Sequence, residues 1–168
     1  MENLKTLLVD DEVEFVQSLA ERLRIRDLSA DTAFNGEQAL SFLQKQEPDV
    51  MILDLKMPGM DGLEVLRRIR KTNPEIQVIM LTGHGTKKHE DEARRLGAFG
   101  FLEKPVNIDI LVDKIWAAYK KKMEQTTTAA PLQKSVRLRL SEIPSKKRSA
   151  DSDLLWSPKG QGTALLFS

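Results

Sequence analysis

A chain of 168 residues can bury the core of one ordinary domain and leaves too little sequence for a second catalytic domain. It contains no cysteine, which excludes disulfides, thiolate zinc sites and cysteine nucleophiles and fits a reducing compartment. No apolar run approaches the roughly 20 residues of a membrane span, and residues 1–5 lack the pattern of an export signal. We therefore expect a cytoplasmic protein without a membrane partner.

The net charge of +1 hides an uneven distribution of charged residues along the chain. From Lys120 onward there are ten basic and four acidic residues, whereas the preceding residues include 16 basic and 21 acidic ones. A compact acidic unit followed by a basic tail is the simplest organisation. We expect a domain over residues 1–122 and a linker or tail over residues 123–168 that is disordered or loosely attached.

Strand and helix patterns alternate from the start of the chain. Residues 6–9 are predicted to form a buried strand, and apolar residues then recur at helical spacing over residues 13–23. A weaker strand pattern covers residues 28–34. Asn35 and Gly36 open a second helix, which Pro48 prevents from continuing.

The middle of the chain repeats this order. Residues 50–53 form a short apolar strand pattern, and residues 56–60 must be a loop. Asp61 can cap the helix that follows, which Asn73 and Pro74 end. Residues 76–81 are the fourth predicted strand.

The last predicted helices flank a fifth strand. A polar helix stops at Gly97, a residue suited to the left-handed position after a helix. Residues 99–103 form the strand, and Asn107 caps a helix whose apolar stripe runs to Tyr119. Five strands and five helices in strict alternation predict an α/β fold with right-handed crossovers and helices on both faces of a parallel sheet.

Four of the predicted strands run into residues suited to phosphate chemistry. These residues are Asp10 with Asp11, Asp54, Thr82 and Lys104. Because the carboxyl ends of parallel strands lie along one edge of a sheet, the residues should become neighbours. Clustered carboxylates repel one another unless a cation joins them, and an all-oxygen set suits Mg²⁺ better than zinc or copper. The pattern predicts a hard-metal site.

Each residue also has an ordinary structural explanation. Asp10 and Asp11 could cap a helix, and Thr82 and Lys104 could simply end strands. As functional groups, the carboxylate of Asp54 could attack phosphorus, and the hydroxyl of Thr82 could donate a hydrogen bond to a phosphoryl oxygen. The ammonium of Lys104 would neutralise phosphoryl charge.

Four stretches, LLVDDE, DVMILDLKMPGMDGLEVLRRIR, VIMLTGHG and GAFGFLEKP, resemble in order and spacing the receiver domain of bacterial two-component response regulators. The resemblance covers roughly residues 3–121. It implies a flavodoxin-like (βα)5 fold, a doubly wound parallel five-stranded sheet with strand order 2-1-3-4-5. It also implies that Asp54 accepts a phosphoryl group from a sensor histidine kinase or phosphotransfer protein.

The resemblance assigns a role in metal binding to four residues. Asp11 and Asp54 would bind Mg²⁺ directly, together with the backbone carbonyl of Lys56. Asp10 would act mainly through water.

The resemblance also implies a switch. Thr82 and Lys104 would contact the phosphoryl oxygens, and Phe101 would change rotamer as Thr82 moves. Many relatives have tyrosine at the position of Phe101, so this chain would keep the packing and lose a hydroxyl. Phe101 could also be an ordinary core residue.

The tail gives weaker patterns. Residues 126–131 look like a linker, residues 136–140 alternate like an edge strand, and residues 154–156 and 164–167 could form a hairpin. Nothing after residue 124 has the paired amphipathic helices of a helix-turn-helix, so we expect no direct DNA binding and an output through a downstream protein target. A homodimer through residues 93–119 stays open.

Three functions follow from these alternatives. The first is a phosphorylation-switched receiver that catalyses only its own phosphorylation and dephosphorylation. The second is a phosphorylation-independent adaptor. The third is an aspartyl phosphatase, for which Leu55 and Lys56 after Asp54 fail to supply the second carboxylate of an Asp-x-Asp hydrolase.

Overall fold

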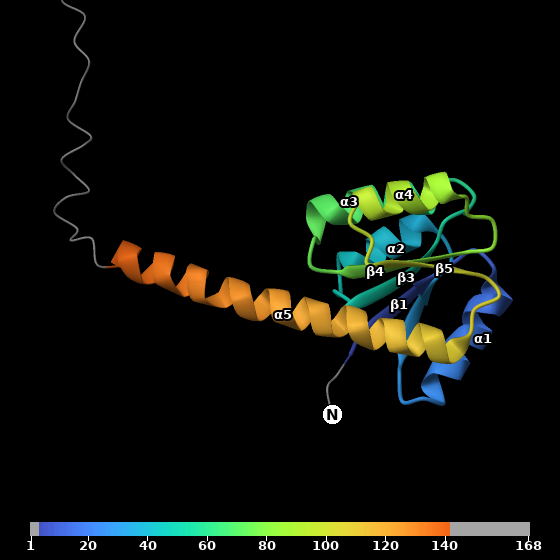
Figure 1. Ribbon diagram of the computed structural model, residues 1–168, viewed down its shortest axis with the longest axis horizontal. Coiled ribbons are helices and arrows are strands. Elements are labelled where there is room, and N and C mark those ends of the chain that lie inside the picture. The colour runs from blue at the N-terminus through green and yellow to red at the C-terminus, as the bar shows by residue number, and fades with distance from the viewer. Residues whose placement is uncertain (1–3, 142–168) are drawn as a thin grey trace, which may run out of the picture. The chain divides into compact units, whose positions relative to one another are not determined.

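The computed structural model describes the backbone of residues 4–141 and the side chains of residues 4–127 (Figure 1). The strands are β1 (Thr6–Val9), β2 (Ala30–Ala33), β3 (Val50–Asp54), β4 (Gln77–Thr82) and β5 (Gly100–Glu103). The helices are α1 (Val13–Arg24), α2 (Gly36–Leu43), α3 (Gly62–Thr72), α4 (Lys87–Arg95) and α5 (Ile108–Ser141). The predicted alternation of five strands and five helices is confirmed.

All four strand pairs are parallel, and the sheet order is β2-β1-β3-β4-β5. This is the predicted flavodoxin-like order. Helices α1 and α5 cover one face of the sheet, and α2, α3 and α4 cover the other (Figure 1). Strands covered on both faces need apolar residues at successive positions, which explains the apolar runs at residues 7–9 in β1 and residues 50–53 in β3.

Successive strand residues point into two separate cores. Leu7 and Met51 pack with α2, α3 and α4, whereas Leu8 and Ile52 pack with α1 and the first turns of α5. This division follows from the two-residue period of a strand. Burial of both faces holds the central strands rigid beneath their carboxyl ends.

Side-chain caps begin three of the helices at the predicted positions. The Oδ1 atoms of Asn35, Asp61 and Asn107 accept hydrogen bonds from backbone amides in the first turns of α2, α3 and α5, at 2.8–2.9 Å. Gly97 has a φ of 87° after α4, as predicted. The α4 cap was not predicted: Thr86 accepts from the amide of His89, whose Nδ1 accepts from the amide of Thr86.

Helix α5 is longer than the sequence patterns predicted. Residues 126–131 have helical backbone and not that of a linker, and residues 136–140 are helical and not an edge strand. The expected edge strand was wrong because five alternating residues are too few to define a period. Helix-forming Lys, Gln, Ala, Leu and Arg side chains dominate residues 120–141 and outweigh Pro131.

Contacts divide the chain into a first unit, Met1–Thr126, and a second, Thr127–Ser168. The proposed boundary between residues 122 and 123 stays a prediction. The predicted hairpin over residues 154–167 lies outside the described residues. Among the described helices, none combines the length and the apolar composition needed to cross a membrane.

Helix α3 approaches the end of β3 so closely that only glycine fits at its first residue. The Gly62 amide donates to the carbonyl of Leu55 at 2.9 Å. A Cβ atom at position 62 would lie 2.1 Å from the backbone oxygen of Asp54. The missing side chain therefore sets the distance between α3 and the strand that ends at Asp54.

We predict that Gly62→Ala lowers the free energy of unfolding by about 1–3 kcal/mol, because backbone atoms must move to relieve the overlap. Urea denaturation of both chains measures this difference. Gly83→Ala is the control, since a Cβ there would have its nearest neighbours 3.9 Å away. Equal stability of Gly62→Ala and the parent chain would contradict the close approach.

Candidate functional site

The carboxyl edge of the sheet gathers the residues that the sequence singled out. Asp10 directly follows β1, Asp54 and Thr82 end β3 and β4, and Lys104 directly follows β5. The Nζ atom of Lys104 lies 2.6 Å from Oδ2 of Asp10 and 3.5 Å from Oδ1 of Asp54. Strand pairing places Thr82 beside Glu103, the residue before Lys104. The predicted meeting of these distant residues is therefore observed.

Three carboxylates form a compact acidic group. Asp10, Asp11 and Asp54 each offer an oxygen atom, and these atoms lie within 4.8 Å of one another. Asp10 and Asp54 are only 4% and 5% exposed, whereas Asp11 is exposed. One open and two buried carboxylates fit a hard divalent cation such as Mg²⁺, which prefers oxygen ligands and retains several waters.

The two oxygens of Asp10 already have protein partners. Oδ1 accepts from the amide of Glu12 at 2.9 Å, and Oδ2 accepts from Lys104 at 2.6 Å. Asp11 has no hydrogen bond or ion pair within the described part of the chain. Asp11 is therefore better placed than Asp10 to bind a cation directly. Direct binding of Mg²⁺ by both Asp11 and Asp54, which the resemblance implies, stays a prediction.

Lys104 is the positive centre of this edge. Besides Asp10 and Asp54, its ammonium contacts the carboxylate of Glu12, with 2.9 Å between Nζ and Oε1. The ammonium also lies 4.4 Å from the ring centroid of Phe15. Burial alone would lower the pKa of Lys104, but its hydrogen bonds with Asp10 and Glu12 and the charge of Asp54 outweigh burial and raise it. Lys104 therefore stays charged.

Glu12 is a residue of the site that the sequence patterns did not predict. The hydrogen bond from Lys104 lowers the pKa of the Glu12 carboxyl group. Glu12 is the third acidic residue of LLVDDE, and that run was the available signal. Only the position of Lys104, 92 residues away along the chain, reveals the contact.

Asp54 is held in an environment that disfavours its charge. Ile52 and Leu81 line the space beside Asp10 and Asp54. Burial and the nearby charge of Asp10 raise the pKa of Asp54 from 3.8 to about 6, against the opposing effects of Lys104 and the Lys56 amide. That amide donates to Oδ2 of Asp54 at 3.0 Å. The role of the Lys56 carbonyl as a metal ligand stays a prediction.

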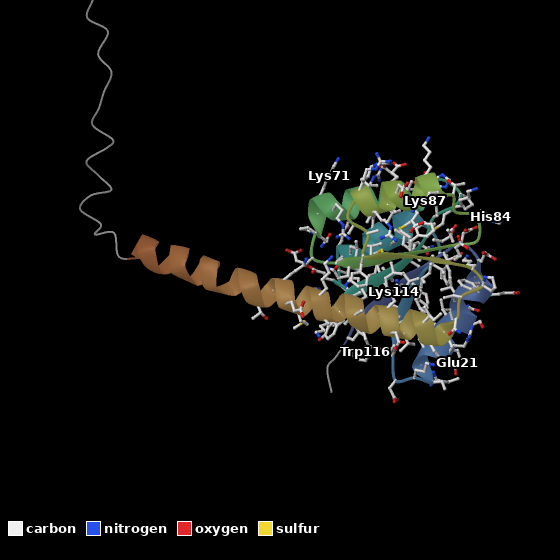
Figure 2. The ribbon with its side chains drawn as sticks, viewed as in Figure 1. Glu21, Lys71, His84, Lys87, Lys114 and Trp116 are labelled. Atoms are coloured by element: carbon white, nitrogen blue, oxygen red, sulfur yellow. The ribbon has the colours of Figure 1, made fainter. Side chains whose placement is uncertain are left out.

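Thr82 and Phe101 lie side by side at the same edge. Thr82 is buried, and its Oγ1 accepts from the amide of His84 at 3.2 Å, which leaves the hydroxyl proton free to donate. Phe101 is half-buried and packs against the core below α4. Figure 2 shows His84 on the loop after β4, near the ends of the strands. The rotamer change of Phe101 stays a prediction.

Known proteins can now be compared with this geometry. The family described as the response regulator receiver domain matches residues 6–116, which include the whole sheet and every site residue. The chain belongs to this receiver family.

Two relatives and one solved structure show how far the similarity of this receiver extends. Sporulation initiation phosphotransferase F of Bacillus subtilis (strain 168) is 37% identical over 68% of this chain and 93% of its own length. The DNA-binding transcriptional regulator NtrC of Klebsiella pneumoniae is 31% identical over 95% of this chain, which spans only 36% of that regulator. A receiver domain protein from Clostridium thermocellum has a TM-score of 0.69 at 35% identity, covering 73% of this chain and 98% of that one.

The raised pKa of Asp54 predicts how the stability of the receiver depends on pH without divalent ions. Asp54 binds its proton more tightly in the folded state than in the unfolded state. Protonation of Asp54 therefore stabilises the folded chain fully below about pH 4, and this stabilisation is lost as the pH rises through about 6. A shift of about two units corresponds to roughly 2–3 kcal/mol. Asp54→Asn should therefore stabilise the chain by up to this amount above about pH 6.5, and by little near pH 4.

Urea denaturation in EDTA across this pH range measures the difference between the two chains. Asp31→Asn removes an exposed strand aspartate and is the control. A stability difference between Asp54→Asn and the parent chain that does not change with pH would rule out the perturbed carboxyl group.

Proposed function

We propose that this receiver accepts a phosphoryl group on Asp54, in the presence of Mg²⁺, from a phosphohistidine of a sensor kinase or phosphotransfer protein. The observation that carries the proposal is the buried Asp54 carboxylate, with Lys104 at 3.5 Å and the oxygens of Asp10 and Asp11 beside it. A carboxylate is a competent nucleophile toward phosphorus when positive charge offsets the repulsion of the phosphoryl oxygens.

In this reaction an oxygen of Asp54 forms a bond to phosphorus, and the bond between phosphorus and the histidine nitrogen breaks with its electrons passing to the imidazole. Bound Mg²⁺ would supply charge neutralisation between Asp54 and the phosphoryl oxygens. Lys104 supplies a second positive charge. The hydroxyl of Thr82 accepts a hydrogen bond from the amide of His84, so its proton can still donate to a phosphoryl oxygen.

Burial of Asp54 favours the transfer step. Apolar residues exclude water from one side of the carboxylate, so nearby charges act on it more strongly than they would in bulk water. The same burial keeps the free carboxylate protonated to a greater extent than an exposed one. Positive charge from a cation held by Asp10, Asp11 and Asp54 would offset that penalty, so the reactivity of Asp54 would depend on Mg²⁺.

The output is proposed to be a change in affinity for a downstream protein target. NtrC is named as a DNA-binding regulator, but this chain spans about a third of its length, so that activity is not carried over. We propose no direct DNA binding by this chain, a cytoplasmic location and no enzymatic activity beyond its own phosphorylation and dephosphorylation. A homodimer through α4, β5 and α5 stays a prediction.

Incubation with Mg²⁺ and acetyl phosphate followed by intact mass measurement tests the proposal. We expect one phosphoryl adduct on the parent chain and on Asp31→Asn, and none on Asp54→Asn. Asp10, the other buried carboxylate beside the ammonium of Lys104, already accepts a hydrogen bond on each oxygen. An adduct that survives in Asp54→Asn would contradict the assignment.

The same experiment separates the two alternative functions. A phosphorylation-independent adaptor would take no adduct and would bind its target equally well as the parent chain and as Asp54→Asn. An aspartyl phosphatase would release phosphate from unrelated esters over many turnovers.

A further inference from the structure

Gly85 lies on the loop between β4 and α4, at the point where Thr82 and Phe101 meet. A Cβ atom at position 85 would lie 2.7 Å from Cγ2 of Thr82, 2.7 Å from Cζ of Phe101 and 3.0 Å from Cε1 of Phe101. Real Cβ atoms do not approach other carbon atoms this closely. The space that an ordinary side chain would fill is therefore already occupied by both residues.

The backbone conformation of Gly85 does not explain the glycine. Among the described glycines only Gly59 and Gly97 have a left-handed φ. Any residue could adopt the conformation at position 85 if it had room. Glycine is therefore required here because Thr82 and Phe101 leave no room for a Cβ atom.

The two neighbours differ in how they could yield to a side chain at position 85. Thr82 is buried, and rotation about its Cα–Cβ bond would move Oγ1 away from the amide of His84. Phe101 is half-buried, and the tip of its ring is the free end of the side chain. A methyl group at position 85 would overlap both side chains, and the ring tip is the part that can move away more easily.

We propose that Gly85 is a positioning residue of this receiver, whose missing Cβ lets the Phe101 ring and the Thr82 methyl group share one space against the β4–α4 loop. The position of the ring is thereby tied to that of Thr82. Gly85 also precedes Thr86, which caps α4, so the shared space adjoins the start of that helix. The link to phosphorylation rests on the proposed function, whereas the packing does not.

The packing is tested by aromatic and methyl NMR spectra of the full chain carrying ¹³C-labelled Phe and Thr. The ring signals of Phe101 are assigned as those that disappear in Phe101→Leu. Gly85→Ala should shift these ring signals and the methyl signal of Thr82. Gly83→Ala is the matched control, because a Cβ there lies 3.9 Å from the nearest atoms, which belong to Lys104. It should leave the Phe101 signals in place. Unchanged Phe101 and Thr82 signals in Gly85→Ala would overturn the inference.

The functional link is tested by the rate of phosphorylation with acetyl phosphate and Mg²⁺. Gly85→Ala should lower the rate by at least about twofold, the small end of the coupling expected between contacting residues. In the Phe101→Leu background, where the ring tip is gone and only the overlap with Thr82 remains, Gly85→Ala should lower the rate by less than it does in the parent chain. Equal effects of Gly85→Ala in both backgrounds would overturn the coupling.

Two remaining outcomes also decide the question. If Gly85→Ala does not fold but the double variant with Phe101→Leu does, the shared space is supported, whereas failure of both chains to fold would overturn it. If the parent chain takes no phosphoryl group, the proposed function fails, and the NMR comparison alone decides the packing.

Discussion

The site depends on the balance between two buried carboxylates and one ammonium. Asp10 and Asp54 are nearly excluded from water, and each would be costly to ionise there without a positive partner. Lys104 contacts both of them, and its contact with Asp10 at 2.6 Å is the shorter. Asp54 is thus the less fully compensated carboxylate, which agrees with its raised pKa and with its proposed role as the group that reacts.

Two glycines allow the segments around these charged groups to lie close together. Gly62 lets α3 begin against the backbone of Asp54, and Gly85 lets the loop after β4 close over Thr82 and Phe101. The strand that ends at Asp54 and the strand carrying Thr82 are neighbours in the sheet, with Asp54 paired to Leu81. Thr82 therefore lies beside the strand of Asp54 and also beside Gly85, the residue that precedes the Thr86 cap of α4.

Much of this could be predicted from the sequence because the signals were local. The apolar runs, the caps at Asn35, Asp61 and Asn107 and the turn at Gly97 each depend on a few adjacent residues, and all were confirmed. The meeting of Asp10, Asp54 and Lys104 followed from one rule about parallel strands. The contact of Glu12 with Lys104 and the clearance at Gly85 depend on side-chain positions that no spacing encodes. The length of α5 was not predicted because residues 126–131 include three threonines and Pro131, which are weaker helix formers than the residues on either side.

Isothermal titration calorimetry with Mg²⁺ near pH 7.5 shows whether the three aspartates form a single cation site balanced by Lys104. We expect one binding event on the parent chain, weakened by Asp11→Asn and Asp54→Asn, because each removes an oxygen ligand and a negative charge. The exposed substitution Asp31→Asn should leave the binding unchanged. Absence of Mg²⁺ binding by the parent chain, or equal binding by all four chains, would mean that the aspartates do not form such a site.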